Sequence, residues 1–436
     1  MSSIKNILFM IPPSKELFSK KIFIVFALLF LLSFQLIYGF LFSSVGSSGT
    51  WHPIEDFLPK STSQSFGNIL LDKIFPLISS RYSLHSDALL YLELGRDFSA
   101  EAYRGHAFTE RPLWPFLIFL SSKFISLFIS VSDALIFGLA MLLNFILAGT
   151  AVLLFFLLIE KLISLKTAWL SSILLIFSPF VHTFLNQPMA ETLMLFIVVF
   201  SVFLLYHYLK KPSILKLIVF SLIFGILMLG KMFFAITFFI LLLSFYFRRY
   251  KEGIIFLMLQ PIPLLLWYLW VTKIWQISYY ALAIGPRYKM GVWVFDIIQM
   301  PWQQTSRFFL SAFPSFIIAL AYSFFLIPIF FSMIGFQKLP FKSKNLIYFG
   351  SIFSLAAFFF LIRLYAFRHA FLLFPIIYPT CVLGIDRIAE FFKKKASWLA
   401  PVFYATIIGL IIFVSSINVY QIFDYSQEIP FPIRLF

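Results

Sequence analysis

Carboxylates and basic side chains recur where apolar runs of this chain meet its polar segments. Three carboxylates stand out as candidate catalytic groups: Asp87, Glu110 and Glu191. A carboxylate can take a proton from a hydroxyl group as a general base, and several together can bind a divalent ion such as Mg²⁺ or Mn²⁺. Cations and hydrogen-bond donors can stabilise the negative charge of a departing phosphate. The candidates for holding substrate or phosphate are Arg111, Lys231, Arg363, Arg368, His369, Tyr91 and His106.

The composition of the chain decides the class of protein that presents these groups. Of 436 residues, 61% are hydrophobic, 21% are aromatic and only 12% are charged. Soluble domains carry about 25% charged residues, so a soluble globule and a disordered chain are excluded. The single cysteine, Cys381, cannot form an internal disulfide. The sequence predicts an all-α polytopic membrane protein.

Eleven apolar segments are predicted to span the membrane, since a span needs about 20 mostly apolar residues. A further apolar segment, Leu113–Val131, follows Pro112 and contains Pro115, several serines and Lys123, which favour a helix lying at the outer interface or re-entering the membrane there. Ile214–Leu229 and Met232–Phe247 are short and form two spans or one re-entrant pair. The eleven are Ile22–Phe42, Ala134–Ile159, Thr167–Val181, Ala190–Leu209, Ile214–Leu229, Met232–Phe247, Gly253–Val271, Phe308–Gly335, Asn345–Ile362, Phe371–Ile385 and Trp398–Tyr420.

The distribution of charge predicts the orientation. The net charge is +16, from 34 Lys and Arg against 18 Asp and Glu. If Leu113–Val131 does not cross, the N-terminus and every short basic loop fall on one side, which the positive-inside rule makes cytoplasmic. That side holds 19 of the basic and 5 of the acidic residues. The basicity is therefore a signal of topology in a multi-pass plasma-membrane protein that contacts lipids, and not of nucleic-acid binding.

The predicted topology makes residues 1–436 a single transmembrane domain with no separate soluble domain. Its largest outer segment, residues 43–133, begins with a flexible stretch, Ser43–Ser65, and carries interfacial helices. Tyr82–Phe98 has helical character, with Asp87 and Tyr91 on one face. The candidate carboxylates and cations all fall at the outer face, so the site is expected to be extracytoplasmic.

The order of these motifs resembles the GT-C glycosyltransferase superfamily. The motifs are Asp87-x-x-x-Tyr91, Glu110-Arg-Pro-Leu-Trp-Pro115, Ser178-Pro179 before an acid that begins the fourth span, Gly230-Lys231 in a short hairpin, and Arg368-His-Ala-Phe-Leu-Leu-Phe-Pro375. The resemblance covers most of the chain and points to the protein O-mannosyltransferase and aminoarabinose transferase group.

The resemblance implies a polyprenyl-phosphate sugar as donor and an essential aspartate in the first outer loop, which is Asp87 here. Glu110 and Glu191 would orient the acceptor or bind a divalent metal. Arg111, Lys231, Arg363 and Arg368 would hold the phosphate. The chain departs from the family in having no sizeable C-terminal soluble domain, which leaves the acceptor open.

Each candidate also has a structural interpretation. Asp87 or Glu191 can favour a helix N-terminus, Glu110 and Arg111 can form a local ion pair, and basic residues can reach lipid headgroups. The histidines can be interfacial and Tyr91 can be a packing residue. A transporter or flippase of a lipid-linked or anionic substrate is the alternative function, and a structural subunit of an envelope assembly is a third.

The topology predicts which positions reagents can reach from outside. Cysteines introduced at Ser61 and Gln304 should react with a membrane-impermeant maleimide in intact cells, whereas Ser343→Cys should react only after lysis. Labelling of Ser343→Cys in intact cells would reverse the orientation. Cys381 should stay unlabelled in the parent chain because it lies in an apolar run.

Overall fold

The computed structural model describes most of the predicted helical segments. Side chains are described for all of its residues except 15–21, 38–42, 51–53, 83–87 and 416–417. The described residues are 15–42, 51–53, 83–103, 112–230, 248–277, 301–304, 323–340 and 371–417, with the single positions 306, 317, 320, 321, 345, 348, 350 and 351.

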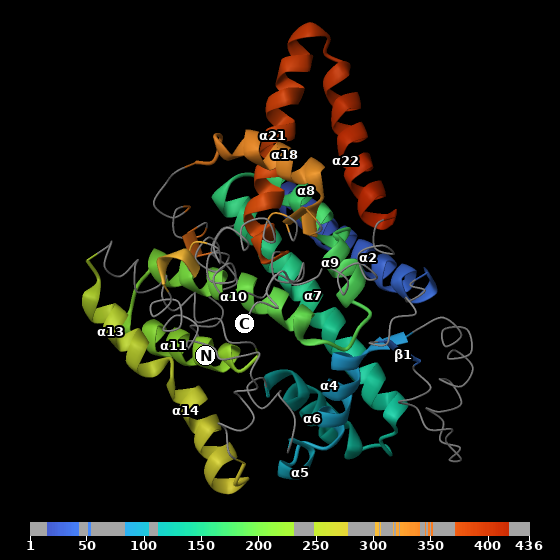
Figure 1. The fold of residues 1–436 in the computed structure, drawn as a ribbon. Helices are drawn as coiled ribbons and strands as arrows, with labels where there is room; N and C mark the ends of the chain where they lie inside the picture. The colour runs from blue at the N-terminus through green and yellow to red at the C-terminus, as the bar shows by residue number, and fades with distance from the viewer. Residues whose placement is uncertain are drawn as a thin grey trace.

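The described part of the chain is predominantly helical, as the sequence predicts (Figure 1). Two three-residue strands, β1 (Trp51–Pro53) and β2 (Ser83–His85), pair antiparallel, and β2 directly precedes the helix that begins at Ser86. The helices are α2 (Lys15–Phe42), α4 (Ser86–Arg96), α5 (Ala100–Tyr103), α6 (Leu113–Ser126), α7 (Asp133–Leu162), α8 (Leu165–Ile176), α9 (Pro179–Phe184), α10 (Ala190–Lys210), α11 (Ile214–Met228), α13 (Tyr250–Leu259), α14 (Ile262–Leu269), the π-helical turn η3 (Trp270–Ile274), α18 (Leu326–Phe336), the 3-10 turn η4 (Phe371–Leu373), α21 (Phe374–Lys395) and α22 (Leu399–Ile417).

Four helical segments of the described part are long and apolar enough to cross a membrane. The total of eleven spans stays a prediction. Met232–Phe247 lies outside the described residues, and Phe308–Gly335 and Asn345–Ile362 are described only in part. The four segments are Asp133–Leu162, Ala190–Lys210, Tyr250–Ile274 and Phe371–Lys395.

The third predicted span, Thr167–Val181, differs from the structure. The chain forms α8, which ends at Ile176, and then a separate short helix, α9. Ser178 has extended backbone angles because the residue before a proline is disfavoured in the helical region. Its hydroxyl accepts a hydrogen bond from the backbone N–H of Val181 and caps the new helix. A single apolar run therefore contains a helix break.

The segment Leu113–Val131 forms α6, a helix of 14 residues. At 1.5 Å per residue it extends only about 21 Å, which is short for a crossing. Trp114 and Ile118 are buried against the protein, while Phe116, Leu120 and Phe124 expose a continuous apolar face. One face of α6 thus packs on the protein and the other is apolar and exposed, while its location at the membrane interface stays a prediction.

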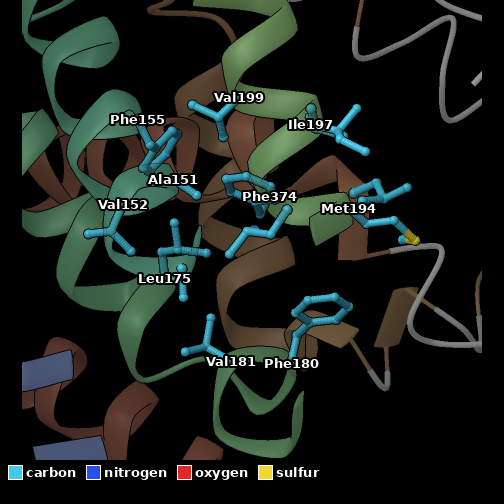
Figure 2. Packing of buried hydrophobic residues seen from close by; sticks show 14 of the residues in the cluster. Ala151, Val152, Phe155, Leu175, Phe180, Val181, Met194, Ile197, Val199 and Phe374 are labelled. Atoms are coloured by element: carbon cyan, nitrogen blue, oxygen red, sulfur yellow. The ribbon is translucent and has the colours of Figure 1, made fainter. Parts of the chain in front are cut away.

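The main apolar core forms where α7, α8, α9, α10 and α21 meet (Figure 2). The Phe155 ring of α7 lies edge-on to Phe374 of α21, with centroids 5.2 Å apart. Phe180 of α9 stacks on Phe371 of η4 at 4.3 Å. These contacts connect the first half of the chain to its last third and fix the position of α9.

The ion pairs among the described residues agree with the predicted division of loops between two sides. Lys166 pairs with Asp386 at 2.5 Å and Lys338 with Glu390 at 2.8 Å, and the charge rule assigns all four residues to the inner side. Arg96 and Asp133, both assigned to the outer side, lie 3.4 Å apart. In Figure 1 the helices α4, α5 and α6, which the charge rule assigns to the outer side, lie at the end opposite the tip of the α21–α22 hairpin. Which side faces the cytoplasm stays a prediction.

Helices α18 and α21 approach each other so closely that only glycine fits at their crossing. A Cβ atom on Gly335 would overlap the carbonyl of Thr380, and one on Gly384 would overlap the carbonyl of Phe331. Ser332 and Thr380 hydrogen-bond across the same crossing at 2.5 Å. Small residues commonly permit such close packing between membrane helices.

Gly384→Ala should destabilise the protein, because an added methyl must separate two helix backbones at a cost of about 1–3 kcal/mol. We expect a lower unfolding temperature in detergent for this variant. The matched control is Gly409→Ala on α22, where nothing lies within 4 Å of the added carbon. An equal unfolding temperature for both variants would contradict the close crossing.

Candidate functional site

A buried non-helical turn between α9 and α10 contains the polar side chains of Asn186 and Gln187. We refer to residues Leu185–Met189 as the α9–α10 turn. Every residue from 178 to 195 is buried, so the carbonyls of this turn cannot rely on bulk water. Buried carbonyls need hydrogen-bond donors from the protein.

Asn144 of α7 supplies donors to this turn. Its side-chain amide donates to the carbonyl of Gln187 and, at 3.5 Å, to the carbonyl of Phe184. Its side-chain oxygen accepts a hydrogen bond from the Thr192 hydroxyl, which also lies 3.3 Å from the carbonyl of Met189. One amide thus bonds to both ends of the turn.

Helix α6 supplies a further donor from the outer segment. The indole N–H of Trp114 donates to the carbonyl of Pro188 at 3.1 Å. One residue earlier, the backbone N–H of Leu113 donates to the carbonyl of Leu229 at 3.3 Å, just after α11 ends. The start of α6 therefore connects the α9–α10 turn to the C-terminal end of α11.

His182 of α9 is held in a neutral state beside α2. Gln35 Nε2 lies 2.8 Å from His182 Nδ1. Because an amide nitrogen only donates, Nδ1 accepts this bond and carries no proton. The imidazole is 5% exposed, and burial lowers its pKa to about 4.

Two of the three predicted carboxylates can be placed on helices. Glu191 lies in the first turn of α10, 3% exposed, where the N–H groups of the helix N-terminus favour a negative charge. Asp87 lies in the first turn of α4, and its side chain is outside the described part. Helices α4 and α10 both pack against α7. Tyr91 is 2% exposed and lies in the apolar core with Trp114 and Ile118, and its role as a substrate contact stays a prediction.

The other predicted site residues lie outside the described residues. Their nearest described neighbours in the chain can be located. Gly230, which precedes Lys231, packs against α10, since a Cβ there would lie 2.8 Å from Ile197 and 3.0 Å from Leu193. The residues outside the described part are His106, Glu110, Arg111, Lys231, Arg363, Arg368 and His369.

The predicted divalent-metal site stays a prediction. Among the described residues there is no group of three His, Cys, Asp or Glu side chains that could hold a metal ion. The predicted set of Asp87, Glu110 and Glu191 includes two side chains outside that part of the chain. Glu191 is the one predicted ligand whose side chain the structure places.

The uncharged polar residues of this site are not among the residues predicted from the sequence. Gln35 and Asn144 each lie inside a predicted span, and neither is ionisable. A lone amide within a long apolar run is itself a signal, since burial of an unbonded amide is costly. Their partners could not be predicted, because they lie 147 and 43 residues away in the chain.

Comparisons with known proteins gave no match to the chain, either among family models or among curated proteins.

The neutral state of His182 predicts a loss of stability in mild acid. The unfolded chain binds a proton near pH 6.5, whereas the folded imidazole resists protonation until about pH 4. Stability is therefore complete above pH 6.5 and falls by roughly 1.4 kcal/mol per pH unit below it. Thermal unfolding in detergent between pH 7 and pH 4.5 measures this slope.

His182→Gln should flatten that pH dependence, because a neutral amide replaces the imidazole. Ser33→Ala is the matched control: Ser33 lies on α2 near Gln35 and its hydroxyl bonds to the carbonyl of Leu29. This variant should show the same dependence of stability on pH as the parent protein. An unchanged slope in His182→Gln would show that the titrating group lies elsewhere.

Proposed function

We propose that the chain is an integral-membrane glycosyltransferase that moves a sugar from a polyprenyl-phosphate donor to an acceptor hydroxyl. The site lies at the extracytoplasmic face of the plasma membrane, around the start of α4, the start of α6 and the α9–α10 turn. Asp87 acts as the base. Arg111, Lys231, Arg363 and Arg368 hold the phosphate, and Glu110 and Glu191 orient the acceptor or bind a divalent ion.

The observation that carries this proposal is the meeting of separate predicted motifs at one buried turn and the first two turns of the helix that follows it. Trp114, from the motif that begins at Glu110, donates to Pro188. Glu191 begins the next helix, and Gly230, from the Gly-Lys motif, packs against that helix. Three motifs that are far apart in the chain thus each contribute a residue near the α9–α10 turn or the start of α10.

The last predicted motif also has a described residue beside this region. Phe371, which follows the Arg368-His369 pair, stacks on Phe180 of α9. Phe180 lies one helical turn before the α9–α10 turn. The apolar residues of the motifs therefore pack together, which supports a common location for the charged residues beside them.

The chemistry needs a base on one side of the sugar and cations on the other. Asp87 takes the proton as the acceptor oxygen attacks the anomeric carbon. The bond from that carbon to the phosphate oxygen breaks, and the polyprenyl phosphate leaves with both electrons. Basic side chains stabilise its charge. Attack opposite the leaving group inverts the configuration. A site at the membrane edge lets the lipid of the donor remain in the bilayer.

A transporter or flippase is the second candidate, and the break between α9 and α10 favours it. Interrupted helices with polar groups at the break form the substrate sites of many transporters. The break here contains the buried side chains of Asn186 and Gln187, and Glu191 lies buried in the first turn of the helix that follows. Transport and transfer differ in their products, so one assay separates them.

Purified protein in nanodiscs, given a radiolabelled polyprenyl-phosphate sugar and candidate acceptors, should form labelled product. Asp87→Asn should reduce the rate by about 100-fold or more, since general-base catalysis contributes roughly 10²–10⁴-fold. Glu93→Gln is the matched control: Glu93 is an exposed carboxylate on the same helix, and its loss should leave the rate unchanged.

Full activity in Asp87→Asn would reject Asp87 as the base. Movement of the labelled lipid between leaflets of proteoliposomes, without product, would favour the flippase.

A further inference from the structure

Asn144 is a buried amide in the middle of the longest described helix. It lies eleven residues after Asp133, about 16 Å along α7 at 1.5 Å per residue. Its exposure is 0%, and Ala140, Met141 and Ala148 on the same face of α7 are also buried. An amide at such a position is costly unless its hydrogen bonds are satisfied.

The contacts of Asn144 use both kinds of group in the amide. The nitrogen has two hydrogens, and it has two acceptors, the carbonyls of Gln187 and Phe184. The oxygen accepts from the Thr192 hydroxyl. Leucine, which has a similar size, could make none of these bonds.

These partners lie on both sides of Glu191 in the chain. Gln187 precedes it by four residues and Thr192 follows it directly. Trp114 bonds only to the preceding side, at Pro188. Among the described hydrogen bonds, those of Asn144 are the ones that join the turn to the first turn of α10 through another helix.

We propose that Asn144 is a positioning residue for Glu191: it fixes the α9–α10 turn and the first turn of α10 relative to α7. The expected effect of Asn144 on catalysis rests on the proposed function. The expected effect of Asn144 on the structure of the turn does not depend on that function. Asn144 itself contacts no reacting atom.

Activity measures the first consequence. Asn144→Leu should lower kcat about 10- to 100-fold, the range expected when a catalytic group is displaced by about 1 Å. Thr192→Val, which removes one partner and keeps the shape, should lower it in the same direction. In a Glu191→Gln background, Asn144→Leu should change kcat less than about twofold, because residues that act through each other are not additive. If Asn144→Leu lowers kcat by the same factor in the parent protein and in the Glu191→Gln background, the proposal is overturned.

Hydrogen exchange measured by mass spectrometry tests the turn itself. In Asn144→Leu and Thr192→Val, peptides that cover residues 184–193 should exchange at least about tenfold faster, because local opening becomes easier. Peptides from α21 should be unchanged. The matched control is Ser221→Ala, which removes a buried hydroxyl bonded to the carbonyl of Leu217 in its own helix. It should leave exchange in the turn unchanged.

The two measurements separate the two proposals. Faster exchange in the turn, without transferase activity in the parent protein under any donor tested, supports the positioning of the turn and rejects the proposed function. Unchanged exchange in both variants overturns the role of Asn144, whatever the activity shows.

Discussion

The need to satisfy buried backbone carbonyls shapes the centre of this protein. The α9–α10 turn lies among apolar helices, where a carbonyl without a donor would cost about 1–3 kcal/mol. Asn144 and Trp114 supply donors to this turn, from α7 and α6. Because those helices come from different parts of the chain, satisfying one turn also fixes α6 against the helix core.

The same constraint explains why the candidate site is formed at this place. A helix break within an apolar bundle leaves backbone groups that need polar partners. The side chains that supply these partners form a polar region inside the protein. Glu191 lies at the start of the helix after the break, where the helix N-terminus favours its charge. Structural demands and catalytic demands therefore call for the same kinds of residue, and mutagenesis must separate them.

The ends of the helices show a second kind of organisation, based on charge. Lys166 and Asp386 pair across α8 and α21, and the Tyr404 hydroxyl of α22 donates to the same carboxylate at 2.8 Å. Lys338 and Glu390 add a pair between α18 and α21. Exposed pairs of this kind contribute little each, but they join loops that the charge rule assigns to one side. The close crossing of Gly335 and Gly384 lies between these charged ends and the core.

The sequence by itself determined the class of protein, the helical character of its segments and the approximate limits of helices such as α7 and α10, because apolar length and composition are local properties. It also predicted a helix within Leu113–Val131, where α6 forms. Only the tertiary structure showed that one apolar run breaks at Ser178 and that Asn144, Gln35 and Trp114 meet the α9–α10 region. Those partners are distant in the chain, and their pairing depends on how the helices pack, which no local pattern records.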